Sequence, residues 1–300
     1  MRLARQADTR ALAQRAYIGT PAPRANAAAA APHANTGTPA PHANAATLAQ
    51  RASASAQTRA RTLIAAHRGS SAHAPENTLS SVLRADADGA DIAEIDVQLT
   101  ADGAVVLYHD ESLRAHGLDR RVDELPFAQL AALDIGFRFR RDYEGESIPQ
   151  LREVIAAARD RIRLNIELKP YGDVRALANA VASIVTAERF VEQCLVTSFD
   201  LEAIAYIKSI NPAIRTGLIA SSPAAVTPEL LAGNVDAVSM KSRAVNRRLV
   251  LRLRRHGKEL HVWTVNDERE MQRMLRLGVT SILTDDPPKL RALMLREKAR

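Results

Sequence analysis

Two histidines of this 300-residue chain stand at the ends of apolar, strand-like segments. His67 directly follows the apolar run 63–66, with Arg68 after it, and His109 closes the apolar run 104–108. Imidazole gains and loses a proton near neutral pH more readily than any other side chain. Two imidazoles from different strand ends can serve as an acid and a base on opposite sides of a substrate. The pattern favours an enzyme site.

Three carboxylates occupy comparable positions inside apolar strands. Side chains alternate along a strand, so Glu94 and Asp96 share one face, and Glu167 shares a face with Asn165 and Lys169. Carboxylates aimed at one interior raise each other's pKa unless a cation sits among them. A hard divalent cation with oxygen ligands, Mg²⁺ or Ca²⁺, relieves this repulsion. We therefore predict one divalent metal ion held by Glu94, Asp96 and Glu167.

Arg68 and Lys169 add fixed positive charge to the same set. Cations, imidazoles and a metal together suit an anion that must be attacked, and a phosphodiester is the leading candidate. The structural alternative is a salt-bridge lattice in which Arg68 and Lys169 merely neutralise the carboxylates.

Glu76 and Trp263 are further substrate-binding candidates with structural alternatives of their own. Glu76 lies in the stretch Pro75–Thr78, where Asn77 or Thr78 is expected to cap a helix that begins near Leu79. Trp263 is expected at the rim of the fold, either packed there or in contact with substrate.

Short β-rich runs alternate with amphipathic stretches from residue 61 onward, which is typical of a parallel sheet. Eight strands are expected, through Ile64, Ile95, Ile166, Val196, Gly217, Val238, Val262 and Ile282. Helices are expected near 78–88, 149–160, 173–188, 200–209, 228–232, 246–255 and 267–277, with a closing helix from Pro288. Eight such units predict an α/β fold, the (β/α)8 TIM barrel.

One apolar run does not alternate with a helix. Only the turn 101–103 separates residues 104–108 from the strand that ends at Thr100, and its Asp-Gly pair is a strong hairpin signal. We predict a short hairpin after the second strand that returns His109 to the rim of the barrel.

Residues 1–60 differ in composition from the rest. They are rich in Ala, Pro, Asn, Thr and Ser, and they carry seven arginines against one acid. With few large apolar side chains such a segment cannot offset its ordering entropy, so we expect a disordered tail followed by one domain over 61–300. That domain holds 34 basic and 33 acidic residues, which disfavours nucleic-acid binding by it.

The composition bounds the environment of the chain as well. No run of about 18 apolar residues exists, so we expect no integral membrane segment. A single cysteine, Cys194, is expected in the core and mildly favours the cytoplasm. The oligomeric state stays open.

The chain resembles the glycerophosphodiester phosphodiesterase family, of the phospholipase C-like barrel superfamily, over about residues 62–290. Ten segments match in the family's order. They are His67–Gly69, Pro75–Thr78, Gly89–Val97, Thr100–Gly103, His109–Asp110, Ile148–Leu151, Ile166–Lys169, Ser198–Phe199, Trp263–Asn266 and Thr284–Asp285.

The resemblance implies metal-dependent hydrolysis of small glycerophosphodiesters, such as glycerophosphocholine or glycerophosphoethanolamine, to sn-glycerol 3-phosphate and an alcohol. It also implies an internal attack by the glycerol 2-hydroxyl, which gains from proximity. His67 and His109 match the family's acid/base pair, and Glu94, Asp96 and Glu167 match its metal ligands. Arg68 and Lys169 match its phosphate contacts.

The stretch 113–117 departs from the family's pattern, which has Leu-x-Arg-Thr-Thr after His-Asp, and the identity of the leaving alcohol therefore stays open. One alternative is a lysophospholipase D with an apolar groove at the mouth, for which Leu113, Leu118, Leu125, Phe127, Phe137 and Phe139 are the candidates. An alternative of another class is a catalytically silent barrel that binds a ligand.

Overall fold

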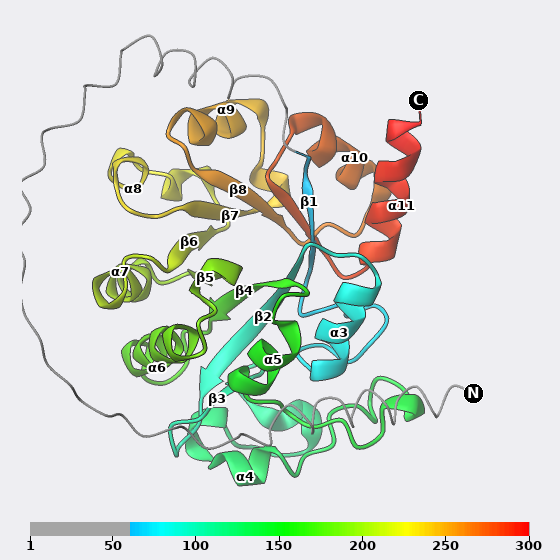
Figure 1. Cartoon of the computed structure of the whole chain (residues 1–300), viewed down its shortest axis with the longest axis vertical. Helices are drawn as coiled ribbons and strands as arrows, with labels where there is room; N and C mark the ends of the chain where they lie inside the picture. The colour runs from blue at the N-terminus through cyan, green and yellow to red at the C-terminus, as the bar shows by residue number, and fades with distance from the viewer. Residues whose placement is uncertain (1–60, 300) are drawn as a thin grey trace, which may run out of the picture. The chain divides into compact units, whose positions relative to one another are not determined.

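The computed structural model describes residues 61–299, which form a closed barrel of eight parallel strands surrounded by helices (Figure 1). Strands β1 and β2 pair with each other and close the barrel. This confirms the predicted TIM barrel. Its strands are β1 Leu63–Ala66, β2 Ile92–Leu99, β4 Arg163–Leu168, β5 Cys194–Ser198, β6 Arg215–Ala220, β7 Ala237–Lys241, β8 Glu259–Trp263 and β9 Ser281–Thr284.

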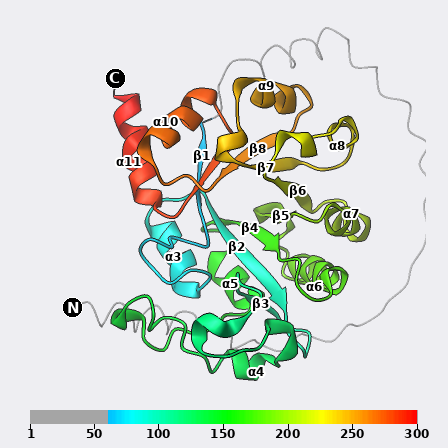
Figure 2. The ribbon, with the colours of Figure 1, turned by 180° about the vertical axis from the view of Figure 1, so that it is seen from behind.

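Helices follow the strands around the outside, as both views of the ribbon show (Figures 1 and 2). All the predicted helices are present, with ends that shift by a few residues. They are α3 Leu79–Ala87, α5 Leu151–Ala158, α6 Val174–Ala187, α7 Leu201–Ile210, α8 Pro228–Ala232, α9 Arg247–Arg255, α10 Glu268–Leu277 and α11 Pro287–Lys298.

The predicted hairpin is present as well. Strand β3, Val105–Leu107, runs antiparallel to β2 and lies outside the ring of eight. The segment between β3 and α5 carries the short helix α4, Phe127–Leu130, and three 3₁₀ turns, η1 Leu113–His116, η2 Val122–Glu124 and η3 Arg141–Tyr143. Further 3₁₀ turns elsewhere are η4 Val191–Gln193, η5 Pro223–Ala225 and η6 Ser242–Ala244.

The leucines of this segment do not form the apolar groove considered from the sequence. Leu113 and Leu125 are buried in a small separate core, and Leu118 and Phe127 pack against it. Phe137 and Phe139 alone among the six candidates are exposed. The physical reason is that the excursion from the barrel needs a core of its own, and its leucines supply it.

The main core lies between the barrel strands and the helices. On β2 and β4 the outward-facing side chains Ile95, Val97, Ile166 and Leu168 are completely buried with residues of α5 and α6. Cys194 is buried here too, as expected. Because strand side chains alternate, burying these apolar residues outward turns Glu94, Asp96 and Glu167 toward the barrel interior.

None of the described helices could cross a membrane. The predicted tail, residues 1–60, lies outside the described residues.

We predict that Ile166→Ala lowers the free energy of unfolding by about 2–5 kcal/mol, because it opens a cavity in the layer that orients β4. Urea unfolding measures this change. Leu251→Ala, on the exposed side of α9, serves as the control and should change the free energy of unfolding by no more than about 0.5 kcal/mol. Equal effects of the two substitutions would contradict this account of the core.

Candidate active site

The parallel register of β2 and β4 brings the three predicted metal ligands together. Asp96 pairs with Glu167, and Glu94 pairs with Asn165 on the same face. One carboxylate oxygen from each of Glu94, Asp96 and Glu167 lies within 4.8 Å of the other two. Glu94 and Asp96 are 2% exposed. The three oxygens form a largely buried donor set of hard oxygens of the kind that a divalent cation takes.

Burial and mutual repulsion make these carboxylates hard to ionise. Burial first, and then the charge of Asp96, raises the pKa of Glu94 from 4.5 to about 8. The same two causes raise the pKa of Glu167, although Lys169 opposes them. A bound cation would remove this repulsion, so the cluster is arranged for one.

The salt-bridge alternative accounts for only part of the cluster. Lys169 Nζ lies 2.9 Å from Glu167 and 3.5 Å from Asp96, and Arg68 Nε lies 3.4 Å from Asp96. Glu94 takes part in no ion pair among residues 61–299. Arg68 and Lys169 therefore pair with only two of the three carboxylates, and the donor set fits a divalent cation better than a closed lattice.

The loop between β1 and α3 folds back onto the carboxylates through left-handed backbone positions. Arg68 has φ of 55°, and its backbone N–H donates to Glu94 Oε2 at 2.8 Å. Gly69 follows with φ of 79°, and a Cβ there would lie 2.3 Å from Ser81 Oγ, so only glycine fits. The sequence His67-Arg68-Gly69 thus builds a sharp turn that presents both charged side chains to the site.

Asn77 holds Asp96 in place, a role that the sequence analysis missed. Its Nδ2 donates to Asp96 Oδ2 at 2.8 Å, and its Oδ1 accepts the Asp96 backbone N–H at 2.9 Å. The expected helix cap is provided by Thr78, whose hydroxyl accepts the Ser81 N–H. The signal in the sequence was the residue type, because asparagine tolerates the left-handed backbone conformation better than most residues do. Asn77 adopts that conformation, with φ of 54°.

His67 is oriented by a second overlooked residue, Asp285, which follows β9. Nδ1 of His67 lies 2.7 Å from Asp285 Oδ1, and Asn266 Nδ2 donates to the other carboxylate oxygen at 2.5 Å. A carboxylate can only accept, so Nδ1 carries the proton and Nε2 is left for the site. Burial alone would lower the pKa of His67, but Asp285 and Glu94 outweigh it and raise that pKa.

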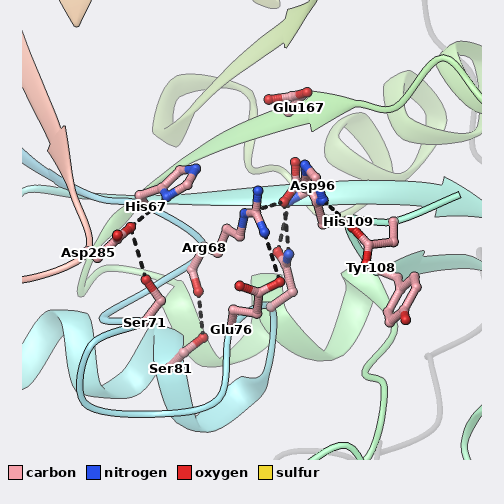
Figure 3. Close-up of polar contacts among 12 residues, drawn as sticks. His67, Arg68, Ser71, Glu76, Ser81, Asp96, Tyr108, His109, Glu167 and Asp285 are labelled. Atoms are coloured by element: carbon pink, nitrogen blue, oxygen red, sulfur yellow. Dashed lines mark hydrogen bonds and ion pairs between the residues drawn. The ribbon is translucent and has the colours of Figure 1, made fainter. Parts of the chain in front are cut away.

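His109 reaches the site from the end of the hairpin. Its Nδ1 lies 2.7 Å from Oδ1 of its neighbour Asp110, whose side chain is largely exposed. Nε2 is therefore the free nitrogen of this ring as well. Figure 3 shows His67 beside Asp285 and His109 on the other side of Arg68.

These groups line one pocket of about 170 Å³ at the carboxyl end of the barrel strands, which we call the mouth. Trp263 lines it, as expected, and its ring packs edge-to-face against Phe199, with centroids 6.0 Å apart. Glu76 is not among the lining residues; it lies 2.8 Å from Arg68 Nη1 instead. The pocket also contains His67, Arg68, Glu94, Asp96, His109, Asn165, Glu167 and Lys169.

Carboxylates, imidazoles and cations around one pocket at the mouth of a TIM barrel define a phosphodiesterase site. Comparison with known proteins agrees. The family model described as the glycerophosphoryl diester phosphodiesterase family matches residues 67–289. The chain belongs to this family, and it is an enzyme of the phosphoric diester hydrolase class.

Individual relatives and solved structures match about three quarters of the chain. A glycerophosphodiester phosphodiesterase of Caldanaerobacter subterraneus is 34% identical over 77% of this chain and 96% of its own. A human lysophospholipase D is 26% identical over 75% of this chain and 83% of its own. An Oleispira antarctica phosphodiesterase, solved with the product sn-glycerol-3-phosphate, is 29% identical with a TM-score of 0.74 and covers 78% of this chain and 97% of that one.

We predict that divalent cation binding displaces a proton, because the pKa of Glu94 lies near 8 in the absence of a cation. Affinity for Mg²⁺ or Ca²⁺ should then rise with pH up to about 8. In chelator, the raised pKa of Glu94 contributes stability that is fully present below pH 4.5 and is lost as the pH rises through about 8. Titration calorimetry in buffers of different ionisation enthalpy measures the proton release. Binding without proton release would contradict the prediction.

We also predict that Asp285→Asn lowers the pKa of His67, because it removes the carboxylate that stabilises the imidazolium. Histidine NMR titration follows the ring directly. The matched control is Asp286→Asn, which changes the neighbouring carboxylate, 3.1 Å from His73 Nε2. The control should leave the pKa of His67 unchanged. An unchanged pKa of His67 in Asp285→Asn would show that Asp285 does not stabilise the imidazolium.

Proposed function

We propose that this protein hydrolyses small glycerophosphodiesters, such as glycerophosphocholine and glycerophosphoethanolamine, to sn-glycerol 3-phosphate and an alcohol. The observation that carries the proposal is that two histidines with free Nε2 atoms share one pocket with three converging carboxylates. The related Oleispira antarctica enzyme, whose solved structure contains sn-glycerol-3-phosphate, supports the same class of product.

Glu94, Asp96 and Glu167 would hold one divalent cation, Mg²⁺ or Ca²⁺. When bound, it would draw charge from the phosphate oxygens and so favour attack at phosphorus. Arg68 and Lys169 lie against the same carboxylates and supply positive charge toward a substrate phosphate. Glu76 is proposed to help binding indirectly, because its ion pair holds the Arg68 guanidinium.

His67 and His109 carry the proton transfers in this proposal. One imidazole accepts the proton of the attacking hydroxyl, and the other donates a proton to the departing alkoxide. Asp285 and Asp110 accept from the Nδ1 atoms, which keeps each Nε2 directed to the pocket. A 2-hydroxyl of the substrate glycerol, held near phosphorus, would be an internal nucleophile with the advantage of proximity. Its attack would release the alcohol and leave a cyclic phosphate, which water would then open to sn-glycerol 3-phosphate.

The apolar side of the pocket suits the carbon skeleton of glycerol. Trp263, Phe199 and Leu283 line it, and the Trp263 indole N–H is already satisfied by the Ser239 carbonyl at 3.2 Å. Trp263 is therefore proposed to contact substrate through its ring face or edge and not through a hydrogen bond.

Hydrolysis of glycerophosphocholine by the purified full chain tests this proposal. We expect turnover with Mg²⁺ or Ca²⁺ and none in excess chelator. His109→Ala should lower kcat by about 10²–10⁴-fold, since it removes one proton-transfer group, and Glu167→Ala should abolish turnover while circular dichroism stays unchanged. His256→Ala, at the end of α9, is the control and should keep full activity. Equal turnover in chelator, or in His109→Ala, would refute the assignment.

A further inference from the structure

Lys241 is a cation at the mouth of the barrel that the chemistry described above does not use. It ends β7 and is exposed, and its Nζ lies 5.9 Å from the centre of the Trp263 ring. Arg68 and Lys169 are both paired with Asp96, whereas Lys241 forms no ion pair within the described part of the chain. Its three N–H donors are therefore available to a ligand.

The alternation of side chains along β7 turns Lys241 toward the inside of the barrel. Its neighbour Met240 is completely buried in the core between strands and helices, and Ser239 lines the active-site pocket. Side chains two residues apart share one face of a strand, so Lys241 lies on the same face as Ser239, one step nearer the mouth. In the register of β7 and β8 it is also the direct partner of Trp263, which lines the pocket.

Lys241 lies across the mouth from the carboxylate cluster. In the closed ring of eight strands, three strands separate β7 from β2 in either direction, and three separate β8 from β4 (Figure 1). The pocket therefore extends from the carboxylates on β2 and β4 to Ser239 on β7 and Trp263 on β8. A phosphodiester whose phosphate lies at the cluster would place one of its two ends beside Lys241.

The charge of Lys241 decides which end of the substrate suits this position. A choline or ethanolamine head group on the Trp263 ring would meet the ammonium that already lies there, and like charges repel. The glycerol end is uncharged, and its terminal hydroxyl can accept a hydrogen bond from a lysine ammonium. The apolar wall formed by Trp263, Phe199 and Leu283 suits the carbon atoms of the same unit.

We propose that Lys241 donates a hydrogen bond to the terminal hydroxyl of the substrate glycerol and is a specificity-determining residue of this enzyme. A site that binds a hydroxyl discriminates against the analogue that lacks it. Because Lys241 is exposed to water, the expected discrimination is about tenfold, less than a fully buried donor would give. This inference rests on the proposed function for its reaction and adds to it the part of the substrate that is recognised.

A substrate that lacks only this hydroxyl isolates the contact. Such a substrate is 2-hydroxypropyl phosphocholine with the configuration of glycerophosphocholine at carbon 2, because it keeps the 2-hydroxyl and has a methyl group in place of the terminal CH₂OH. We expect the kcat/KM of wild type to be about tenfold lower for it than for glycerophosphocholine. Lys241→Met should lower kcat/KM for glycerophosphocholine by the same factor and leave the other value unchanged, so that the two substrates become equal. The change should lie in KM more than in kcat, because the contact is remote from the reacting atoms.

Binding of the products gives a readout that needs no turnover. With Mg²⁺ present, calorimetry should show sn-glycerol 3-phosphate binding to wild type about tenfold more tightly than 2-hydroxypropyl phosphate of the same configuration. Lys241→Met should bind the two compounds equally.

Two further variants separate the hydrogen bond from other effects of the substitution. Lys241→Arg keeps a cationic donor and should retain most of the preference for the terminal hydroxyl. Lys298→Met removes an exposed lysine at the end of α11 and should behave as wild type does with every compound.

Three results would overturn this role of Lys241. They are the absence of a preference in wild type, an unchanged preference in Lys241→Met, and an equal loss of affinity for both compounds in that variant. The last result would indicate a general effect of charge or packing. A wild type that binds the products with the expected difference but does not turn over glycerophosphocholine would instead refute the proposed function and leave the role of Lys241 standing.

Discussion

The repulsion among three carboxylates, two buried and one partly exposed, is the constraint on which the site depends. The parallel register of β2 and β4 sets Asp96 beside Glu167 inside the barrel, with Glu94 on the same face. This arrangement costs free energy unless positive charge is present. Arg68 and Lys169 offset part of this repulsion through their ion pairs with Asp96 and Glu167. The negative charge that remains enables the cluster to bind a cation.

The rest of the site supports those carboxylates and aims the histidines. Asn77 fixes Asp96, and Asp285 fixes His67, although both come from loops remote in the sequence from the strands they serve. Each uses hydrogen bonds in which a carboxylate is an acceptor, so the support is electrostatic as well as geometric. Barrel closure places the loops after β1 and β9 next to each other, which is why Asp285 can reach His67.

The mouth combines two kinds of surface with different physical demands. Its interior is charged and largely buried, whereas its outer edge carries the exposed phenylalanines Phe137, Phe139 and Phe199. The segment between β3 and α5 contributes to both, because its leucines form a small core while Phe137 and Phe139 stay exposed.

The amino-acid sequence by itself determined the strand faces. A side-chain period of two, together with apolar Ile95, Ile166 and Leu168, was enough to turn the three acids to one side. The alternation of eight strand-like runs with helical stretches was enough to predict the barrel. The turn at residues 101–103 also predicted the hairpin, because an Asp-Gly pair between two apolar runs is a strong hairpin signal. These features depend on neighbours within a few residues, so the sequence contains them.

Only the tertiary structure decided which residues act on each other across the barrel. Asn77 was expected as one of two possible helix caps, and Asp285 carried no expected role, because their partners lie 19 and 218 residues away in the chain. The leucines after β3 were likewise ambiguous between a groove and a core. Such contacts follow from the register of the strands and from closure of the barrel. The spacing of residues along the sequence does not show which distant side chains will meet.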